Sequence, residues 1–220
     1  MQIQYYGHSC FKITTKPAGR ATEDIIAVID PFDKEIGLRP PQGQADVVFV
    51  SHDHHDHNNI EAIKGEPVII NTPGEFSVKG INVIGLEAFH DQKEGSERGK
   101  ITIFILETEE LKICHLSDLG GELTEKQLDE IDGVDILFIP VGGNYTIDGK
   151  KATEIVKKIE PAIVIPMHYK MLGTTIDIED ETKFCNEIGN CPKEKITKLT
   201  IKKKDLEEKT MEVVLMSNEI

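Results

Sequence analysis

Four of the eight histidines of this chain lie within seven residues, 51–57, whose sequence is SHDHHDH. The apolar run at 46–50 before this segment predicts a buried strand, and the stretch at 59–64 after it predicts a helix. Like-charged side chains repel one another at this spacing, and burying them without partners costs free energy. A divalent cation that binds neutral imidazole nitrogens and carboxylate oxygens removes both costs. The segment therefore predicts a metal site at the carboxyl end of a strand.

The spacing within this segment matches the template His-x-His-x-Asp-His. The template is filled by His52, His54, Asp56 and His57, and His55 occupies a variable position whose side chain should point away from the metal. The alternative is a solvated loop that is rich in histidine by chance. The predicted strand and helix on either side favour the metal site, because such a motif needs a defined structural context.

The acidic composition limits the partners that this chain can attract. Its formal net charge at pH 7 is -14, which opposes long-range attraction to nucleic acid or to an anionic membrane. The basic run Lys202–Lys204 stands beside Asp205, Glu207 and Glu208, so a solvated strand edge or turn is favoured over a basic patch. We therefore expect a small-molecule substrate, which can be anionic, and no nucleic-acid or membrane partner. The oligomeric state stays open.

Two features bear on the cellular compartment. The amino terminus has no basic segment followed by an apolar one, and no apolar run approaches the roughly 20 residues that cross a bilayer, so we expect a soluble cytoplasmic protein. Cys10 and Cys114 lie in apolar strand contexts and are expected to be buried thiols. Cys185 and Cys191 could pair, but in a cytoplasmic protein we expect a reduced surface loop.

The hydrophobic pattern predicts one α/β domain over residues 1–220. In the first part, strands are expected as a hairpin at 5–14 and at 25–29, 68–70, 81–86, 101–107 and 111–116. In the second part, helices at 124–131, 152–159 and 182–188 alternate with strands at 134–140, 161–166, 196–201 and 211–216. Thr124 and Gln127 have the spacing of a capping box, which predicts the start of the first helix.

Three further candidate ligands each follow a predicted strand: His90, Asp118 and His168. Taken singly, each has an ordinary explanation, as a polar strand end, a turn aspartate or a capped histidine. Site residues collect at the carboxyl ends of strands. Their shared position therefore favours one site formed together with the motif.

This order of motifs resembles the metallo-β-lactamase superfamily over essentially the whole chain. The resemblance implies an αββα sandwich, in which two mixed β-sheets flanked by helices hold a dinuclear site between them. It implies a first metal on His52, His54 and His90, a second on Asp56, His57 and His168, and a bridge between both through Asp118. The β-lactamases themselves have a cysteine in place of Asp118, and an aspartate there resembles the hydrolases of phosphodiesters, lactones and thioesters.

Smaller motifs resemble the compact branch that contains the ascorbate-6-phosphate lactonase. They are GHSCF at 7–11, IDP at 29–31, PVGG at 140–143 and PMHY at 166–169. The resemblance implies that a hydroxide bridging two divalent metals cleaves a small ester-like substrate, a phosphodiester or a lactone. The ligands favour Zn, with Mn or Fe as alternatives.

Three residues are candidates to support this chemistry. We expect Asp56 to orient the hydroxide or receive its proton, and His8 to face the cleft as a substrate-binding or acid group. The alternative for His8 is a half-buried strand histidine. Asp30 is a candidate acceptor for the second nitrogen of a metal-bound imidazole, or else part of a simple Asp-Pro turn. His115 is expected to be structural.

Two sets of residues are candidates to bind negative charge. The first set follows late strands and comprises Asn144, Tyr145 and Tyr169, although Gly-Gly-Asn-Tyr is also ordinary turn chemistry. The second lies in the polar segment after His90 and comprises Lys93, Arg98 and Lys100, for which solvated turn positions are the alternative.

Two other functions stay open beside a metal-dependent hydrolase. One is a non-catalytic metal-binding or sensor protein on the same fold, against which the complete ligand set argues. The other is an iron-dependent redox protein, which usually needs a flavin domain or partner that this sequence does not supply.

Overall fold

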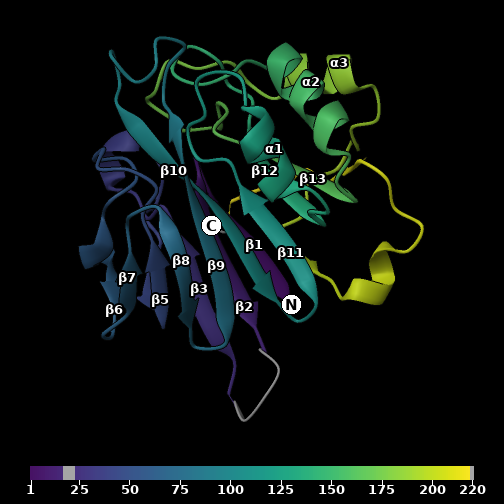
Figure 1. The fold of residues 1–220 in the computed structure, drawn as a ribbon. Coiled ribbons are helices and arrows are strands. Elements are labelled where there is room, and N and C mark those ends of the chain that lie inside the picture. The colour runs from purple at the N-terminus through teal and green to yellow at the C-terminus, as the bar shows by residue number, and fades with distance from the viewer. Residues whose placement is uncertain (17–22, 219–220) are drawn as a thin grey trace.

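Two mixed β-sheets packed against each other make up most of the computed structural model, which describes residues 1–16 and 23–218 (Figure 1). Over these residues, the first sheet consists, in spatial order, of β14 (Lys198–Thr200), β1 (Gln2–Gly7), β2 (Cys10–Thr15), β3 (Ile25–Ile29), β5 (Val47–Phe49) and β7 (Val68–Ile70). The second consists of β15 (Glu212–Val213), β13 (Ile163–Met167), β12 (Ile136–Pro140), β11 (Leu111–His115), β10 (Lys100–Thr108), β9 (Ile81–Phe89) and β8 (Gly74–Val78).

The α-helices of the described chain lie beside the second sheet (Figure 1): α1 (Glu125–Ile131), α2 (Gly149–Ile159) and α3 (Thr182–Ile188). The capping box at the start of α1 is confirmed. The N–H of Gln127 donates to Oγ1 of Thr124 at 3.2 Å, and the N–H of Thr124 donates to Oε1 of Gln127 at 2.8 Å. Two of the backbone donors that a helix start leaves free are thereby satisfied.

A loop rather than a helix covers the outer face of the first sheet. Strand residues and loop residues form a separate buried cluster there, which includes Cys10, Val28, Val48, Phe32, Ile36 and Leu38. This loop, between β3 and β5, contains a short 3₁₀ turn, Lys34–Ile36, and β4 (Gly43–Gln44). β4 pairs with β6 (Ile63–Lys64), which lies in the segment after the histidine motif. The predicted sandwich of two mixed sheets with helices is confirmed, with this loop in the place of one helical layer.

Aromatic pairs join the two sheets across the main core. The rings of Phe11 and Phe138 stack with centroids 4.1 Å apart, and those of Phe49 and Phe104 lie 5.2 Å apart. All four side chains are buried, and each stabilises the fold by about 1.5–3 kcal/mol through the apolar area that it buries. These contacts hold the sheets in register and therefore set how the strand ends of one sheet face those of the other.

The carboxyl ends of several strands meet at one edge of the sandwich. In the second sheet β9 and β11 are both antiparallel to β10, and β11, β12 and β13 are parallel, so β9, β11 and β13 end at the same edge. Two backbone hydrogen bonds tie the sheets together there. The N–H of Thr102 donates to the carbonyl of Ser51 at 2.8 Å, and the N–H of His168 donates to that of His8 at 2.7 Å.

Two elements differ from the prediction. The stretch at 59–64 is not a helix but a 3₁₀ turn, Ile60–Ala62, followed by β6. The N–H of Asn59 donates to the carbonyl of Pro31, and its side chain donates to that of Phe32. These contacts fix the start of the stretch outside a helical path, and a weak local preference does not overcome them. The strand β8 was not predicted, because this half-exposed edge strand lacks a clear apolar pattern.

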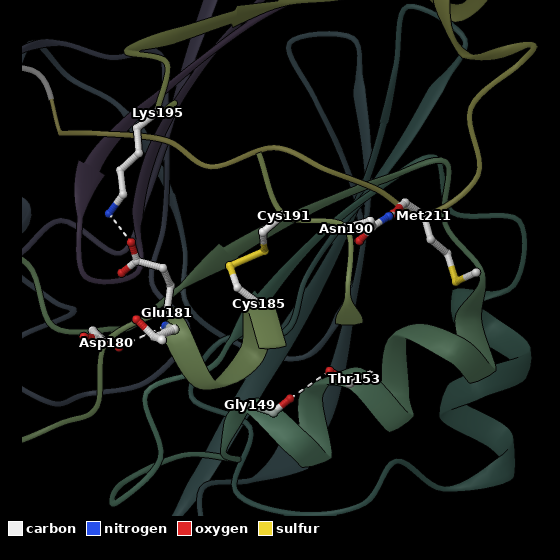
Figure 2. Close-up of a disulfide and its surroundings, with 10 residues drawn as sticks. Gly149, Thr153, Asp180, Glu181, Cys185, Asn190, Cys191, Lys195 and Met211 are labelled. Atoms are coloured by element: carbon white, nitrogen blue, oxygen red, sulfur yellow. Dashed lines mark hydrogen bonds and ion pairs between the residues drawn. A yellow bond between two sulfur atoms is a disulfide. The ribbon is translucent and has the colours of Figure 1, made fainter. Parts of the chain in front are cut away.

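Cys185 and Cys191 form a disulfide (Figure 2), so the expectation of a reduced loop is wrong. Cys185 lies in α3, which ends at Gly189 in the left-handed conformation, with φ 82°. The chain reverses there and brings the two Cα atoms to 5.2 Å, within the range that a disulfide spans. Sequence spacing does not reveal such a reversal. Cys10 and Cys114 are buried free thiols, as expected.

The described residues contain no helix that is both long enough and apolar enough to span a bilayer. The lysine run at 202–204 leads into a 3₁₀ turn, Lys203–Leu206, where Lys203 pairs with Asp135 at 2.8 Å. This agrees with the turn expected from its acidic neighbours.

Candidate metal centre

Asp30 holds the loop that carries the histidine motif. Its buried carboxylate accepts the N–H of Ser51 at 2.8 Å and the hydroxyl of Ser51 at 2.7 Å, and it lies 3.0 Å from Nδ1 of His57. The same hydroxyl oxygen lies 2.9 Å from Nδ1 of His52. Asp30 thus orients two imidazoles of the motif, one directly and one through Ser51, as expected for an acceptor behind metal ligands.

The candidate ligands form two groups, within each of which the ligand atoms lie within 4.8 Å of one another. The first group consists of His52, His54 and His90, and the second group consists of His8, His57, Asp118 and His168. Asp56 belongs to neither, although its Oδ2 is 3.2 Å from Nε2 of His8 and 3.8 Å from Nε2 of His57. The seven predicted ligands therefore lie at one place together with His8, and their binding of metal stays a prediction.

One carboxylate oxygen lies between the two groups. Oδ2 of Asp118 is 3.1 Å from Nε2 of His168, 3.2 Å from that of His57 and 3.5 Å from that of His90. The other oxygen, Oδ1, accepts the hydroxyl of Ser9 at 3.2 Å. From this position the carboxylate can contact cations held by either group, which is the role that the resemblance implies for Asp118.

The hydrogen bonds of the His52 ring provide a test of whether these residues fit a metal. The hydroxyl of Ser51 donates to Asp30, so it accepts from Nδ1–H of His52, and the lone pair of this imidazole is then on Nε2. That atom is buried and has no hydrogen-bond partner among the described residues. A buried lone pair without a partner costs free energy that a bound cation would recover. The donors present, imidazole and carboxylate without thiolate, suit Zn, Mn or Fe.

Burial and charge act in opposite directions within the site. Burial would lower the pKa of His57, but the carboxylates of Asp118 and Asp30 outweigh it and raise that pKa well above its usual value. Burial would likewise raise the pKa of Asp118, but His168 and His57 hold it well below its usual range. For His52, burial and then the neighbouring His57 lower the pKa to about 3. His52 is therefore neutral at pH 7, the form in which imidazole binds metal.

Left-handed backbone recurs at the strand ends that build the site. Four residues there have positive φ: His8 at 56°, Asp30 at 47°, Ser117 at 53° and His168 at 49°. Such conformations cost on the order of 1 kcal/mol or more for residues other than glycine and persist only where surrounding contacts impose them. At these positions the chain turns sharply out of the sheet and presents a side chain to the site.

Two glycines let the ligand-bearing segments approach each other. A Cβ atom on Gly120 would lie 2.3 Å from the carbonyl carbon of His90, and one on Gly142 would lie 2.2 Å from the carbonyl oxygen of His168. Real side chains do not approach backbone this closely. Gly120 therefore permits the placement of a residue of the first group, and Gly142 that of a residue of the second.

A cavity of about 600 Å³ opens onto the candidate ligands. His54, Asp56, His90, Asp118 and His168 line one part of it, and its other walls include Glu35, Ile36, Glu97, Arg98, Tyr145, Thr175, Ile176 and Asp177. The exposed side chain of His55 also lines it, with Nδ1 3.8 Å from Oδ1 of Asp56, although His55 belongs to neither group of candidate ligands. Its volume falls in the range of pockets that bind small molecules.

Some of the residues predicted to bind negative charge lie elsewhere. The expectation for Tyr169 is wrong, because its side chain is buried in the core and its hydroxyl donates to the carbonyl of Met216 at 3.0 Å. It directly follows the candidate ligand His168, whose left-handed backbone, with φ 49°, turns the chain between the two side chains. The amide of Asn144 donates to the carbonyl of Asp177 at 2.7 Å. Tyr145 and Arg98 remain as cavity residues.

His115 is buried in the second sheet, as expected of a structural residue. Its Nε2 lies 2.9 Å from the carbonyl oxygen of Ser9, and its Nδ1 accepts the N–H of Ser117 at 3.2 Å. These contacts connect β11 to the turn that carries His8.

Asp91 organises the segment after His90, a role that the sequence interpretation missed. Its carboxylate accepts four backbone N–H groups, those of Lys93, Gly95, Glu97 and Arg98, at 2.7, 3.1, 3.1 and 2.8 Å. This segment is therefore a turn defined by hydrogen bonds to one carboxylate. An aspartate at the first position of a polar, glycine-containing loop is the signal that could have revealed it.

Comparisons with known proteins agree with this arrangement. The chain matches the family model for the β-lactamase superfamily domain over residues 2–168. It is 30% identical over 195 residues to a UPF0173 metal-dependent hydrolase of Thermoplasma acidophilum, covering 77% of this chain and 83% of the relative. It is 34% identical, with a TM-score of 0.76, to the crystal structure of a candidate Zn-dependent hydrolase of the metallo-β-lactamase superfamily from Thermotoga maritima, covering 98% and 97% of the two chains.

A more distant structure shares the fold alone. The diiron β-hydroxylase CmlA of Streptomyces venezuelae has a TM-score of 0.62 at 14% identity, over 91% of this chain and 54% of that one. The family match and the Thermotoga structure, by contrast, extend over most of this chain at the level of sequence. The chain therefore belongs to the metallo-β-lactamase superfamily, in the part of it whose members are named metal-dependent hydrolases.

Proposed function

We propose that this protein is a hydrolase that binds two divalent cations and cleaves a small ester-like substrate, a phosphodiester or a lactone. One observation carries the proposal. Oδ2 of Asp118 lies within 3.5 Å of histidine nitrogens from both groups, and the same carboxylate lines the cavity. A protein that only stores or senses metal has no need for a cavity of about 600 Å³ beside its ligands.

The first group would hold one cation. His57 and His168 of the second group, together with Asp56, would hold the other, with Asp118 between them and His8 beside them. Zn is the preferred metal, and Mn or Fe would also suit the ligands. Cations bound here would lower the pKa of a water molecule toward neutrality and polarise the carbonyl or phosphoryl oxygen of the substrate.

His8 and Asp56 are the residues proposed to handle protons. Nε2 of His8 lies 3.2 Å from Oδ2 of Asp56 and 3.1 Å from Nε2 of His57. Burial and the neighbouring His168 lower the pKa of His8 to about 4, so this imidazole is neutral at pH 7 and can donate its Nε2–H to Asp56. Burial would raise the pKa of Asp56, but the hydrogen bond with His8 and the neighbouring His57 hold it well below its usual range. Asp56 is only partly buried and lines the cavity, where its carboxylate can orient a nucleophile by accepting a hydrogen bond.

The proposed substrate is a small molecule rather than a nucleic acid or a membrane lipid. The net charge of -14 supports this choice, because it disfavours long-range attraction to polyanions. A cytoplasmic location remains the proposal for the compartment, on the grounds of the sequence.

Metal content and turnover, measured on single variants, test the proposal. Metal per chain is determined by mass spectrometry for the parent protein and for His52→Ala, His57→Ala and Asp53→Asn. We expect about two metals in the parent and about one in each of the first two variants, and hydrolysis of phosphodiesters or lactones should fall at least about 10³-fold. Asp53→Asn is the matched control, because Asp53 belongs to the same motif but is exposed and does not line the cavity, and it should retain both metals and activity.

Three results would argue against the proposal. Little metal in the parent after reconstitution would remove the basis for hydrolysis. Two bound metals without turnover of any ester would favour the sensor role. A visible absorbance from bound iron or flavin would favour redox chemistry.

A further inference from the structure

The cavity beside the candidate ligands contains one arginine and no lysine among the described residues that line it, namely Arg98. Its guanidinium forms no ion pair with any described residue. The structure gives this side chain one partner, the ring of Tyr145, whose centroid lies 5.4 Å from Cζ. A guanidinium that lines a cavity and lacks an anionic partner is available to a ligand.

The two lysines of the same segment differ from Arg98 in this respect. Lys93 pairs with Glu97 at 2.5 Å and Lys100 pairs with Glu87 at 2.9 Å, and neither lysine lines the cavity. Of the three cations that the sequence offers after His90, only Arg98 is therefore both free of a carboxylate and directed to the site.

The backbone holds Arg98 in place. Its N–H donates to Asp91 at 2.8 Å, and the same carboxylate accepts three other N–H groups of the turn. Asp91 directly follows the candidate ligand His90, so the turn that carries Arg98 starts from the first group. The contact with Tyr145 restrains the far end of the side chain. Such restraint lowers the entropy lost when a ligand binds.

Other charges around the cavity limit how much negative charge it accepts. Glu35, Glu97 and Asp177 also line it, and their carboxylates repel a multiply charged anion. One free guanidinium against several acidic side chains suits a ligand with a single negative charge, bound through two oxygens of one oxyanion group.

We infer that Arg98 is a specificity-determining residue that binds an oxyanion of a singly charged substrate, such as a phosphodiester or a lactone that carries one carboxylate. That the bound anion is a substrate rests on the proposed function, but binding of the anion itself can be tested without turnover. Tyr145 and Asp91 act through Arg98, as residues that position it.

Binding of two small phosphate esters to the metal-loaded protein tests this inference. Dimethyl phosphate carries one negative charge, and trimethyl phosphate is its neutral analogue with one more methyl group. Dissociation constants are measured by calorimetry for the parent, Arg98→Gln, Arg98→Lys and Lys100→Gln. The last is the matched control, because Lys100 lies two residues from Arg98 but outside the cavity.

We expect Arg98→Gln to weaken binding of dimethyl phosphate about tenfold or more and to leave trimethyl phosphate unchanged. Arg98→Lys should fall between the parent and Arg98→Gln, because an ammonium keeps the charge but not the two-pronged geometry. Lys100→Gln should match the parent. Equal affinity of Arg98→Gln and the parent for dimethyl phosphate would overturn the inference, as would an equal loss for both esters.

Kinetics separate this inference from the proposed function. With the anionic ester bis(4-nitrophenyl) phosphate, Arg98→Gln should raise KM and change kcat little, whereas with neutral 4-nitrophenyl acetate both constants should stay near those of the parent. If the parent hydrolysed no ester but still bound dimethyl phosphate through Arg98, the hydrolase proposal would fail and the anion site would stand. If the parent hydrolysed both esters and Arg98→Gln had the same KM for each, only the inference would fail.

Discussion

The two groups of candidate ligands differ in how the chain assembles them. The first takes two of its three members, His52 and His54, from one short motif, and His54 is partly exposed to the cavity. The second takes its four members from four separate segments, the β1–β2 turn, the motif, and the ends of β11 and β13, and all four are buried. The first is thus largely a local feature of the sequence, and the second is a product of tertiary structure.

This difference extends to the backbone. Left-handed residues occur at two members of the second group, His8 and His168, and at Ser117 next to a third. None of the three members of the first group, His52, His54 and His90, has a left-handed backbone. Conformations of this kind survive where packing imposes them, so the second group depends more heavily on the intact fold. Substitutions near each group should therefore affect metal binding in the two groups differently.

The largest effect is expected from Asp118→Asn, because Asp118 contacts both groups. The hydroxyl of Ser9 donates to Oδ1, which favours the amide oxygen on that side and leaves the NH₂ facing the histidines. We expect metal content to fall from about two to below one per chain, and hydrolysis to fall by about 10³-fold or more. Asp53→Asn is the control, since Asp53 lies in the same motif with an exposed side chain. Retention of two metals in Asp118→Asn would show that it does not link the groups.

A smaller and more selective effect is expected from Asp30→Asn. Asp30 contacts His57 directly but reaches His52 only through Ser51. Loss of an acceptor behind a ligand typically costs about 10- to 100-fold in metal affinity. Zn titrations followed by NMR of the histidine rings should show weaker binding mainly at His57 and His168. Equal weakening at His52, His54 and His90 would mean that the two groups respond as one unit.

The smallest effects are expected from the glycines that border each group. Gly120→Ala collides with the backbone of His90 and Gly142→Ala with that of His168, and each should lower the free energy of unfolding by about 1–3 kcal/mol. In the same Zn titrations, Gly120→Ala should weaken binding in the first group and Gly142→Ala in the second, each by severalfold.

Gly121→Ala is the control for this pair, because a Cβ there has no neighbour nearer than 3.8 Å. It should change neither stability nor Zn binding measurably. If Gly120→Ala weakened both groups equally, the comparison between a local and a tertiary group would lose its basis.

Much of the fold was predictable where the signal is local. The hairpin at β1 and β2, the strand before the motif and the capping box of α1 depend on neighbouring residues and occur as predicted. The helix at 59–64 failed because contacts with Pro31 and Phe32 override a weak local preference. The disulfide between Cys185 and Cys191 depends on a chain reversal that residue spacing does not encode.

The candidate site divides along the same line. The histidine motif, and the position of His90, Asp118 and His168 after strands, were evident from residue types and spacing. The membership of His8 in the second group, the exclusion of Tyr169, and the choice of Arg98 over Lys93 and Lys100 were not. Each of these depends on the direction in which a side chain leaves its backbone and on the partner already beside it.

The sequence by itself thus determined the family, the strand-end placement of the ligands and the kind of chemistry that their nitrogen and oxygen atoms allow. Only the tertiary structure decided that His8 joins the second group and that one free guanidinium lines the cavity. The physical reason is that ligand chemistry belongs to single residues and their near neighbours in the chain. Assembly of the whole site, by contrast, requires the two sheets to pack in one register. Contacts between distant segments then hold the left-handed turns and the buried charges in place.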